Sequence, residues 1–468
     1  MTTKRPNILF IMSDDHAAHA IGAYGSRINA TPQIDRIAAG GMRLDNAFCT
    51  NAICAPSRAS ILTGTHTHIN GVTTLGAKLD GRQITFPKLF QSAGYQTALV
   101  GKWHLGHGGD NDPTGFDYWN VLPGQGLYHD PEFIEGGVYK TYQGYVTDIT
   151  TDLALDWLDR RDAERPFCLL VHHKAPHRPW VPDAKHADMY EGIDIPEPST
   201  FDDDYRNRAQ AAAAAQMRVD RDLTATDLKQ PVPDNLSPRE EKGWKYQRYI
   251  KDYLRCVASI DDNVGRLLDY LDETGLADDT LVVYTSDQGF FLGDHGWYDK
   301  RFMYEESLRM PLLIRYPREI APGSVNADIV TNVDFAPTFL DYAGLPIPDT
   351  FQGASLRPLL GGTTPASWQT SLYYRYWMHL HDHYVYAHYG VRTQCHKLIY
   401  YYADALGQPM TIDDPKEPEW ELFDLEQDPH ELRSVYHDPA YADVVRDLRA
   451  ELRRLQEQFG DQPHPNEV

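Results

Sequence analysis

Cysteine is scarce in this 468-residue sequence, and its few copies lie far apart. The five are Cys49, Cys54, Cys168, Cys256 and Cys395. Disulfide-rich secreted domains use even, closely spaced sets of cysteines, and zinc sites use short Cys-x2-Cys repeats. An odd and dispersed set fits neither pattern, so the sequence predicts reduced thiols, as in a cytoplasmic protein.

Excess positive charge and long apolar runs are also missing. The formal net charge is −23, and nucleic-acid and anionic-membrane binders need a basic surface, so we expect neither partner. No segment reaches the ~18 uninterrupted apolar residues of a membrane span. The apolar run within residues 1–16 is too short for a secretory signal, which predicts a cytoplasmic location. An anionic small substrate is still compatible with a local cluster of cations.

Short apolar runs indicate the fold class. "NILFIMS", "TALVG", "FCLLV" and "LVVYTS" have the length of strands and are apolar throughout, which is typical of parallel strands buried on both faces. Residues 147–161 and 249–274 have the 3.6-residue period of amphipathic helices. The sequence therefore predicts an α/β fold, with a large and mostly parallel sheet flanked by helices.

Changes of composition divide the chain. We predict an α/β domain over residues 1–345, with a charged, Ala-rich and Pro-rich insertion at about 197–247 that forms a helical excursion and then a loop. Residues 346–468 contain the aromatic runs "SLYYRYW" and "HKLIYYYAD" and end in a charged helical segment at 441–459. They predict a smaller α+β subdomain with a short antiparallel sheet.

Oxygen-bearing side chains follow two of the apolar runs. Asp14 and Asp15 follow the first run, and Asp287 and Gln288 follow the fourth. Ligands of α/β folds bind beyond the carboxyl ends of the strands, and carboxylate and amide oxygens suit Ca²⁺ or Mg²⁺ better than Zn²⁺. An Asp after a strand is also a common turn former, so each pair alone is weak. Two pairs after matching strands favour a metal site.

The stretch "CAPSRASILTG" predicts a short helix with an anion-binding end. Pro56 suits the first helical position, and Gly64 suits the end of the helix. Cys54 then lies at the positive end of the helix dipole, with Arg58 one turn further on. Three interpretations of Cys54 remain open: a structural thiol, a nucleophile of low pKa, and the precursor of a modified residue.

This stretch resembles the C-x-P-S-R signature of type I sulfatases, in which the cysteine is oxidised to Cα-formylglycine. "PNILFIMSDD", "GKWHLG", "SDQGFFLGDHGWYDK" and "ELFDLEQDP" extend the resemblance over nearly the whole chain. It implies an alkaline-phosphatase-like sandwich with a small C-terminal subdomain, and a sulfuric ester hydrolase that uses Ca²⁺, with Mg²⁺ as the alternative. It also implies a formylglycine-generating enzyme as a partner.

The resemblance also implies roles for individual residues. The expected metal ligands are Asp14, Asp15, Asp287, Gln288 and Cys54 as formylglycine. The residues expected around the formylglycine and the sulfate are Arg58, Lys102, His104, Lys174, His177 and Lys300. Gln288 stands where many members have Asn, and Lys174 stands where many have His, with His177 as the alternative in that segment.

The implied reaction begins with attack on sulfur by one hydroxyl of the hydrated aldehyde. Cationic residues stabilise the charge that develops on the sulfate. His177 or the region of Lys300 protonates the leaving alcohol, and His104 acts as the base that releases sulfate.

Within the family, "KAPHRPW" and "DKRFMYEESLRMPLL" resemble bacterial N-acetylglucosamine-6-sulfatases, so we expect a small sulfated saccharide as substrate. His388, with Arg309 or Arg315, is the expected sugar contact; a buried strand histidine is an equal expectation for His388. The alternatives are a phosphonate monoester or phosphodiester hydrolase of the same superfamily and a non-catalytic sulfoglycan-binding protein. Gln288 and Pro56 favour the sulfatase over the phosphonate hydrolase.

Overall fold

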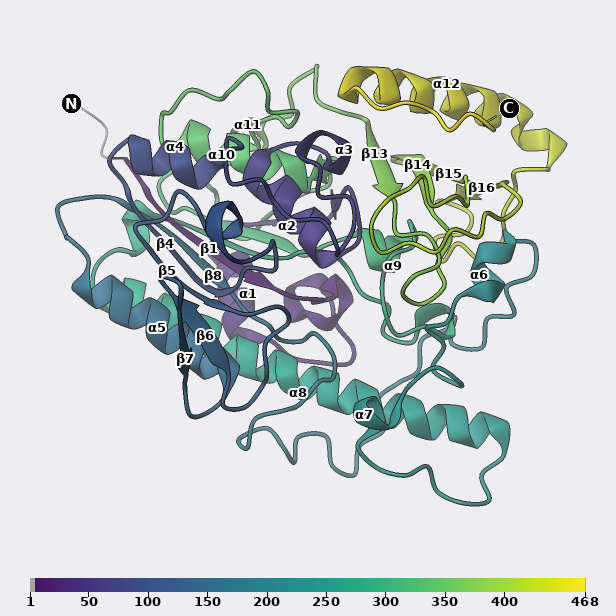
Figure 1. The fold of residues 1–468 in the computed structure, drawn as a ribbon, viewed down its shortest axis with the longest axis horizontal. Helices are drawn as coiled ribbons and strands as arrows, with labels where there is room; N and C mark the ends of the chain where they lie inside the picture. Colours follow the sequence, from purple (N-terminus) through teal and green to yellow (C-terminus); the bar gives the residue numbers. More distant parts are fainter. Residues whose placement is uncertain (1–4, 468) are drawn as a thin grey trace.

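A ten-stranded mixed sheet forms the centre of the computed structural model, which describes residues 5–467 (Figure 1). Its strands in spatial order are β11 (Ser324–Asn326), β2 (Met42–Leu44), β10 (Leu312–Arg315), β9 (Thr280–Ser286), β1 (Asn7–Ser13), β8 (Phe167–His172), β4 (Gln96–Lys102), β5 (Tyr118–Leu122), β6 (Glu132–Glu135) and β7 (Val138–Thr141). The four apolar runs form β1, β4, β8 and β9, which are parallel neighbours. This confirms the predicted fold class, and it places the carboxyl ends of all four strands at one edge of the sheet.

Helices cover both faces of this sheet (Figure 1). On one face, α1 (Pro32–Ala39) and α5 (Val146–Arg160) pack against the long helix α8 (Pro238–Glu273). On the other face, α10 (Phe335–Tyr342) contacts both α2 (Cys54–Thr63) and α4 (Phe86–Ser92). The shorter elements are α3 (Thr67–Asn70), α9 (Glu305–Leu308), α11 (Arg357–Leu360) and the two-stranded pair β3 (Ala47–Phe48) and β12 (Val330–Thr331).

The insertion at 197–247 differs from the predicted helical excursion. It contains only α6 (Gln210–Ala214) and α7 (Ala225–Leu228), joined by turns, and its last ten residues already belong to α8. The α8 helix begins at Pro238 with a capping box, in which Ser237 and Glu240 satisfy each other's backbone N–H groups. The proline-rich segment is therefore shorter than predicted, because a proline in the first turn of a helix loses no hydrogen bond.

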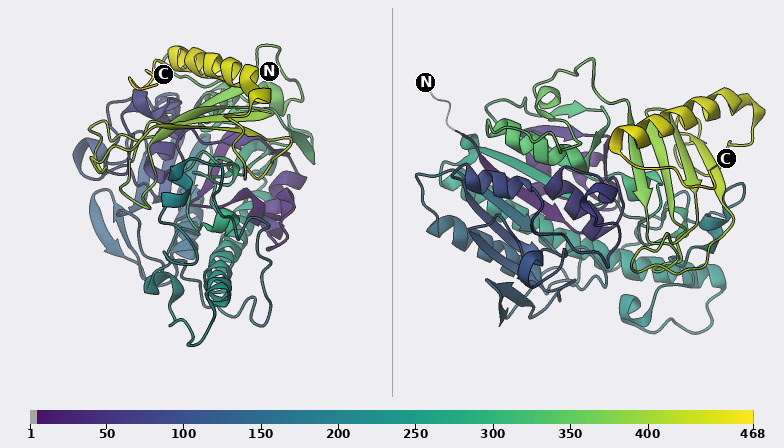
Figure 2. Two further views of the ribbon diagram at one scale, coloured as in Figure 1. Left: turned by 90° about the vertical axis from the view of Figure 1, so that its right-hand side faces the viewer. Right: turned by 45° about the horizontal axis from the view of Figure 1, so that its top comes forward.

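A four-stranded antiparallel sheet forms the smaller part of the molecule (Figure 2). Its strands are β13 (Ser371–Tyr376), β14 (His388–Thr393), β15 (His396–Tyr401) and β16 (Glu419–Asp424). The last helix, α12 (Ala442–Phe459), lies across it and buries Leu452 and Leu455 against Val391 and Leu398. Across the described chain, 5–467, none of the helices combines the length and the apolar character needed to cross a bilayer.

Candidate active site

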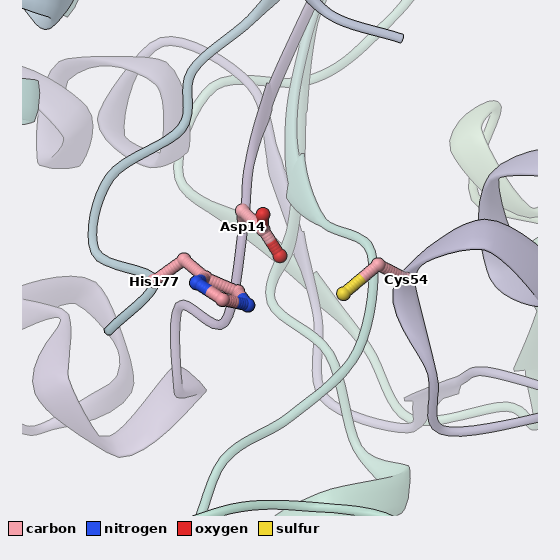
Figure 3. A group of neighbouring side chains, drawn as sticks. All are labelled: Asp14, Cys54 and His177. Atoms are coloured by element: carbon pink, nitrogen blue, oxygen red, sulfur yellow. The ribbon is translucent and has the colours of Figure 1, made fainter. Parts of the chain in front are cut away.

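The strand ends bring the predicted site residues together. Asp14 follows β1, Lys102 is the last residue of β4, Asp287 follows β9, and Cys54 is the first residue of α2. All four side chains are buried. Figure 3 shows Asp14 and Cys54 directed toward each other, with His177 on the neighbouring loop, and their ligand atoms lie within 4.8 Å of one another.

The helix that carries Cys54 starts slightly earlier than the sequence predicts. It begins at Cys54 itself, so Pro56 occupies the third helical position, and it ends at Gly64 in the left-handed conformation, at φ 61°. Arg58 anchors this helix, because its Nε donates to Asp287 at 2.9 Å and its Nη1 donates to the carbonyl of Lys102 at 2.8 Å. The helix end is thereby fixed against two of the strand ends.

Three carboxylates share the buried edge, and each has a cationic partner. Oxygens of Asp14, Asp15 and Asp287 lie within 4.8 Å of one another. Their cationic partners are Lys102 for Asp14, Lys300 for Asp15 at 2.6 Å, and Arg58 for Asp287 at 2.9 Å. Burying charges is costly unless they are paired, so pairing each carboxylate with a cation lowers the cost of burying the acidic cluster.

The acidic cluster fits a hard cation. Burial raises the pKa of Asp15 to about 7 and the pKa of Asp287 to about 6, and in both cases neighbouring carboxylates add to the effect. The Oδ1 atom of Asp14 and the Oε1 atom of Gln288 are buried and accept no hydrogen bond in the described chain. Free carboxylate and amide oxygens are the ligands that Ca²⁺ and Mg²⁺ prefer. In the structure Gln288 turns its amide nitrogen to Asp15, which leaves the oxygen free.

The surroundings of Cys54 disfavour a low-pKa thiol. Burial, followed by the charge of Asp14, raises the pKa of this thiol, despite its place at a helix N-terminus.

Two neighbouring strand-end residues, Asp15 and His104, have positive φ angles of 70° and 59°. Such strained backbone in non-glycine residues is concentrated at functional sites.

Two histidines and one lysine are expected from the sequence to lie beside the sulfate. Burial and then Lys102 lower the pKa of His104, so its imidazole is neutral, and its Nδ1 has no partner among the described residues. The Nδ1 atom of His177 donates to the Arg178 carbonyl at 2.8 Å, and its Nε2 lies 3.9 Å from Asp15. Lys174 is buried over the ring of Tyr128, at 4.8 Å, and burial lowers its pKa to about 8.

A cavity of about 250 Å³ opens above Cys54. Of the residues expected beside the sulfate, His177 and Lys300 line it, whereas Arg58, Lys102, His104 and Lys174 do not. The other polar lining residues were not predicted from the sequence, and they are Gln125, Arg178, Asp299, Arg301, Asp382 and His383. Two features of the sequence could have indicated some of these lining residues. Asp299 and Arg301 flank Lys300, and Gln125 stands between two glycines, both of which have positive φ in the structure.

None of the three expected sugar contacts lines this cavity. His388 is fully buried: its Nδ1 donates to the Tyr386 carbonyl at 2.7 Å, and its Nε2 accepts from the Met303 N–H at 3.1 Å. Arg315 pairs with the start of β9, at the end of the sheet away from Asp287. Arg309 lines a different pocket. The structure thus places these three residues away from the cavity at Cys54, and His388 is a buried strand histidine.

A cavity that ends at Cys54, among buried cations and carboxylates, suits a hydrolase of anionic esters. The sulfatase family profile matches residues 6–345, and the profile described as N-sulphoglucosamine sulphohydrolase, C-terminal, matches residues 293–458. The chain belongs to the sulfatase family and is a sulfuric ester hydrolase. Members of this family generally use formylglycine and a divalent metal.

Relatives of known name agree with this assignment. The N-acetylglucosamine-6-O-sulfatase of Bacteroides thetaiotaomicron is 44% identical over 98% of this chain and 88% of its own length. The N-acetylglucosamine-6-sulfatase of Homo sapiens is 29% identical over 80% of this chain and 68% of its own.

Solved structures give the same result. A structure described as a complex with its substrate D-glucosamine-2-N,6-O-disulfate has a TM-score of 0.93 and 43% identity, covering 99% of this chain and all of that one. A phosphonate monoester hydrolase from Silicibacter pomeroyi has a TM-score of 0.77 at 23% identity, covering 98% of this chain and 96% of that one, and shares the fold. The predicted family and fold class are confirmed.

Proposed function

We propose that this chain removes the 6-O-sulfate from a glucosamine whose nitrogen carries an acetyl or a sulfate group. The cavity above Cys54 is the observation that carries this proposal, and the substrates named for the similar sulfatases support it. At about 250 Å³ it is smaller than the ~300–1,000 Å³ typical of pockets for drug-sized ligands. That size favours one terminal sugar inside the cavity and therefore removal of sulfate from the end of a short saccharide.

Two chemical groups complete the proposed site. Cys54 is the proposed target of a formylglycine-generating enzyme, and the hydrated aldehyde supplies one hydroxyl to attack sulfur and a second to release sulfate. Asp14, Asp15, Asp287 and Gln288 would hold the cation, for which we propose Ca²⁺ with Mg²⁺ as the alternative. When bound, the cation supplies positive charge next to the sulfate oxygens.

The chain's own cations surround the same point. Arg58, Lys102 and Lys300 are buried and held by carboxylates, so they are oriented before the substrate arrives. Preorganised charges of this kind stabilise a transition state without reorganisation. We therefore assign these three residues to the sulfate oxygens.

The two histidines have complementary proton-transfer roles in this proposal. The hydrogen bond from Nδ1 of His177 to the Arg178 carbonyl leaves Nε2 as the atom for the leaving alcohol. His104 is neutral with a free Nδ1, as a general base requires. Lys174 lies outside the cavity lining, which favours His177 over it.

The test measures sulfate release from glucosamine-6-sulfates carrying N-acetyl or N-sulfate groups. The protein is co-expressed with a formylglycine-generating enzyme, supplied with Ca²⁺, and its Cys54 peptide is weighed by mass spectrometry. Rapid release from either sugar supports the proposal. If the aldehyde is present and an aryl sulfate or a phosphonate monoester is hydrolysed while both sugars are not, the proposed substrate is wrong.

A further inference from the structure

Arg178 lines the cavity with a guanidinium group that is only partly used. Its Nε and Nη2 donate to the two oxygens of Asp227 at 3.0 and 2.5 Å, and the group lies over the ring of Tyr298 at 5.4 Å. The third nitrogen, Nη1, donates to no atom of residues 5–467, and the side chain is 26% exposed. Arg178 thus holds one free charged donor at the cavity.

The other cationic groups of the cavity lining are already occupied. Lys300 contacts both oxygens of Asp15. Arg301 uses Nε for Asp299, Nη1 for Tyr376 and Nη2 for Asp382, at 3.2 to 3.5 Å. His383 pairs with Asp299 and with the Gln216 carbonyl. Within the described lining, Arg178 is therefore the guanidinium with a nitrogen left for a ligand.

The insertion fixes the position of Arg178. Asp227 belongs to α7 and is 1% exposed, and its Oδ2 also accepts from the backbone N–H and the hydroxyl of Thr224 at 2.8 and 2.7 Å. Beside it, Lys229 joins α7 to α8 through Asp252 at 2.8 Å. A buried carboxylate with this many donors has little freedom, so it holds the guanidinium in one orientation.

We infer that Arg178 is a substrate-binding residue that donates to an oxygen on the substituent of the sugar nitrogen, and that Asp227 is its positioning residue. This inference rests on the proposed function. In a glucosamine with sulfates at N and O6, one sulfate lies at Cys54, and the other is an oxygen-rich group that needs a donor. An N-sulfate and an N-acetyl group both offer an oxygen acceptor, whereas a free amine offers none.

The experiment compares three glucosamine-6-sulfates that differ only at nitrogen: N-sulfate, N-acetyl and free amine. Arg178→Gln lowers kcat/KM for the N-sulfate by about 10- to 100-fold, the equivalent of one lost charge-assisted hydrogen bond. The kcat/KM for the N-acetyl substrate falls less, and that for the free amine falls least. The kcat/KM values of the three substrates therefore become more similar in the variant. The loss is expected mainly in KM, because the contact is made equally in the ground and transition states.

Asp227→Asn lowers kcat/KM in the same order, most for the N-sulfate and least for the free amine, but by smaller factors than Arg178→Gln. Asp227→Glu keeps a carboxylate and therefore retains part of the preference for the N-sulfate. A matched control exists in the same insertion, where Arg218 pairs with Asp220 through two bonds of 2.9 and 2.8 Å outside the cavity lining. Asp220→Asn removes an arginine–aspartate pair that is more exposed at its carboxylate, and it leaves the preference among the three substrates unchanged. Thermal unfolding of each variant identifies any that fold poorly, including loss of stability in Arg178→Gln from the unpaired Asp227 of α7.

The outcomes separate the inference from the function on which it rests. Loss of the preference for the N-sulfate alone, or for both the N-sulfate and the N-acetyl substrate relative to the free amine, supports the inference. An equal fall in kcat for all three substrates overturns it, since Arg178 would then act only through His177, which donates to its carbonyl. If the wild-type enzyme hydrolyses an aryl sulfate but none of the three sugars, the proposed function itself is wrong, and the inference falls with it.

Discussion

Two buried polar regions of this molecule use similar residues in opposite ways. In the small sheet, both ring nitrogens of His388 have hydrogen-bond partners, and aromatic rings surround it. At the strand ends of the large sheet, Asp14, Gln288 and His104 each keep a buried polar atom without a partner in the described chain. Buried polar atoms are normally hydrogen-bonded, so unpaired atoms that lie at the strand ends together with the acidic cluster are what a ligand site requires, and the complete pairing of His388 fits a structural role.

The largest effect expected in the strand-end region follows from Cys54→Ala. Loss of the residue that supplies the attacking group should lower kcat by about 10⁴- to 10⁶-fold, the scale for removing a nucleophile. The change alters only one small side-chain group, whether thiol or aldehyde, so the melting temperature should stay close to that of the wild type. Cys49→Ala is the matched control, because Cys49 is equally buried and lies outside the cavity lining. Full sulfate release by the Cys54 variant would contradict the covalent mechanism.

Removal of divalent metal should affect the strand-end region and leave the small sheet intact. After chelation we expect sulfate release to stop and the melting temperature to fall, with both restored by Ca²⁺ or Mg²⁺. A cation at about 100 times its Kd adds about 2.7 kcal/mol to the free energy of unfolding. Asp287→Asn should abolish the calcium-dependent thermal shift. Unchanged activity and melting temperature after exhaustive chelation would exclude the proposed role of the acidic cluster.

Loss of a single buried cation should have an intermediate effect. Lys102→Ala or Arg58→Ala is expected to lower kcat by about 10²- to 10³-fold, the scale for a lost donor to a developing negative charge. The measurement is steady-state sulfate release at saturating substrate, with the fold checked by circular dichroism. A fall of less than about threefold in both variants would show that these residues serve only to pair Asp14 and Asp287.

The His388→Phe substitution tests the structural side of the comparison. It keeps an aromatic ring but leaves the Met303 N–H without its acceptor, which should cost about 1–3 kcal/mol of unfolding free energy. The kcat/KM of the folded enzyme should stay within about twofold of the wild type. Urea denaturation measures the free energy of unfolding, and sulfate release measures kcat/KM. A large rise in KM with an unchanged free energy of unfolding would contradict the structural role and indicate that His388 contacts the substrate.

The smallest expected effect is a pH dependence in the same region. Burial lowers the pKa of His388 to about 4, below its usual value of 6.5, so between these values the unfolded chain binds a proton that the folded chain does not. Stability is therefore lost as the pH falls through this window, by about 1 kcal/mol from pH 6 to pH 5 for one histidine. His388→Phe should reduce this slope in urea denaturation; an unchanged slope would show that other buried histidines account for it.

The insertion shows where local sequence was a poor guide. The run of alanines favours a helix, yet α6 has only five residues. Residues outside the insertion fix the start of α6, because the backbone N–H groups of Ala209 and Gln210 donate to Glu421 and Glu419 of the small sheet, both at 2.7 Å. Partners distant in sequence thus fix where α6 begins, since the first N–H groups of a helix have no partner within it.

The sequence by itself determined the fold class and most of the strand-end region. Apolar runs indicate the parallel strands, and whatever follows a strand lies at its carboxyl end, so the order of residues is enough to predict Asp14, Lys102 and Asp287 at one edge of the sheet. Only the tertiary structure decided which side chains line the cavity. Arg178 is held by Asp227, 49 residues away, and His388 is enclosed by strands from other segments. Burial and pairing depend on contacts between distant segments, and no local pattern of residues contains them.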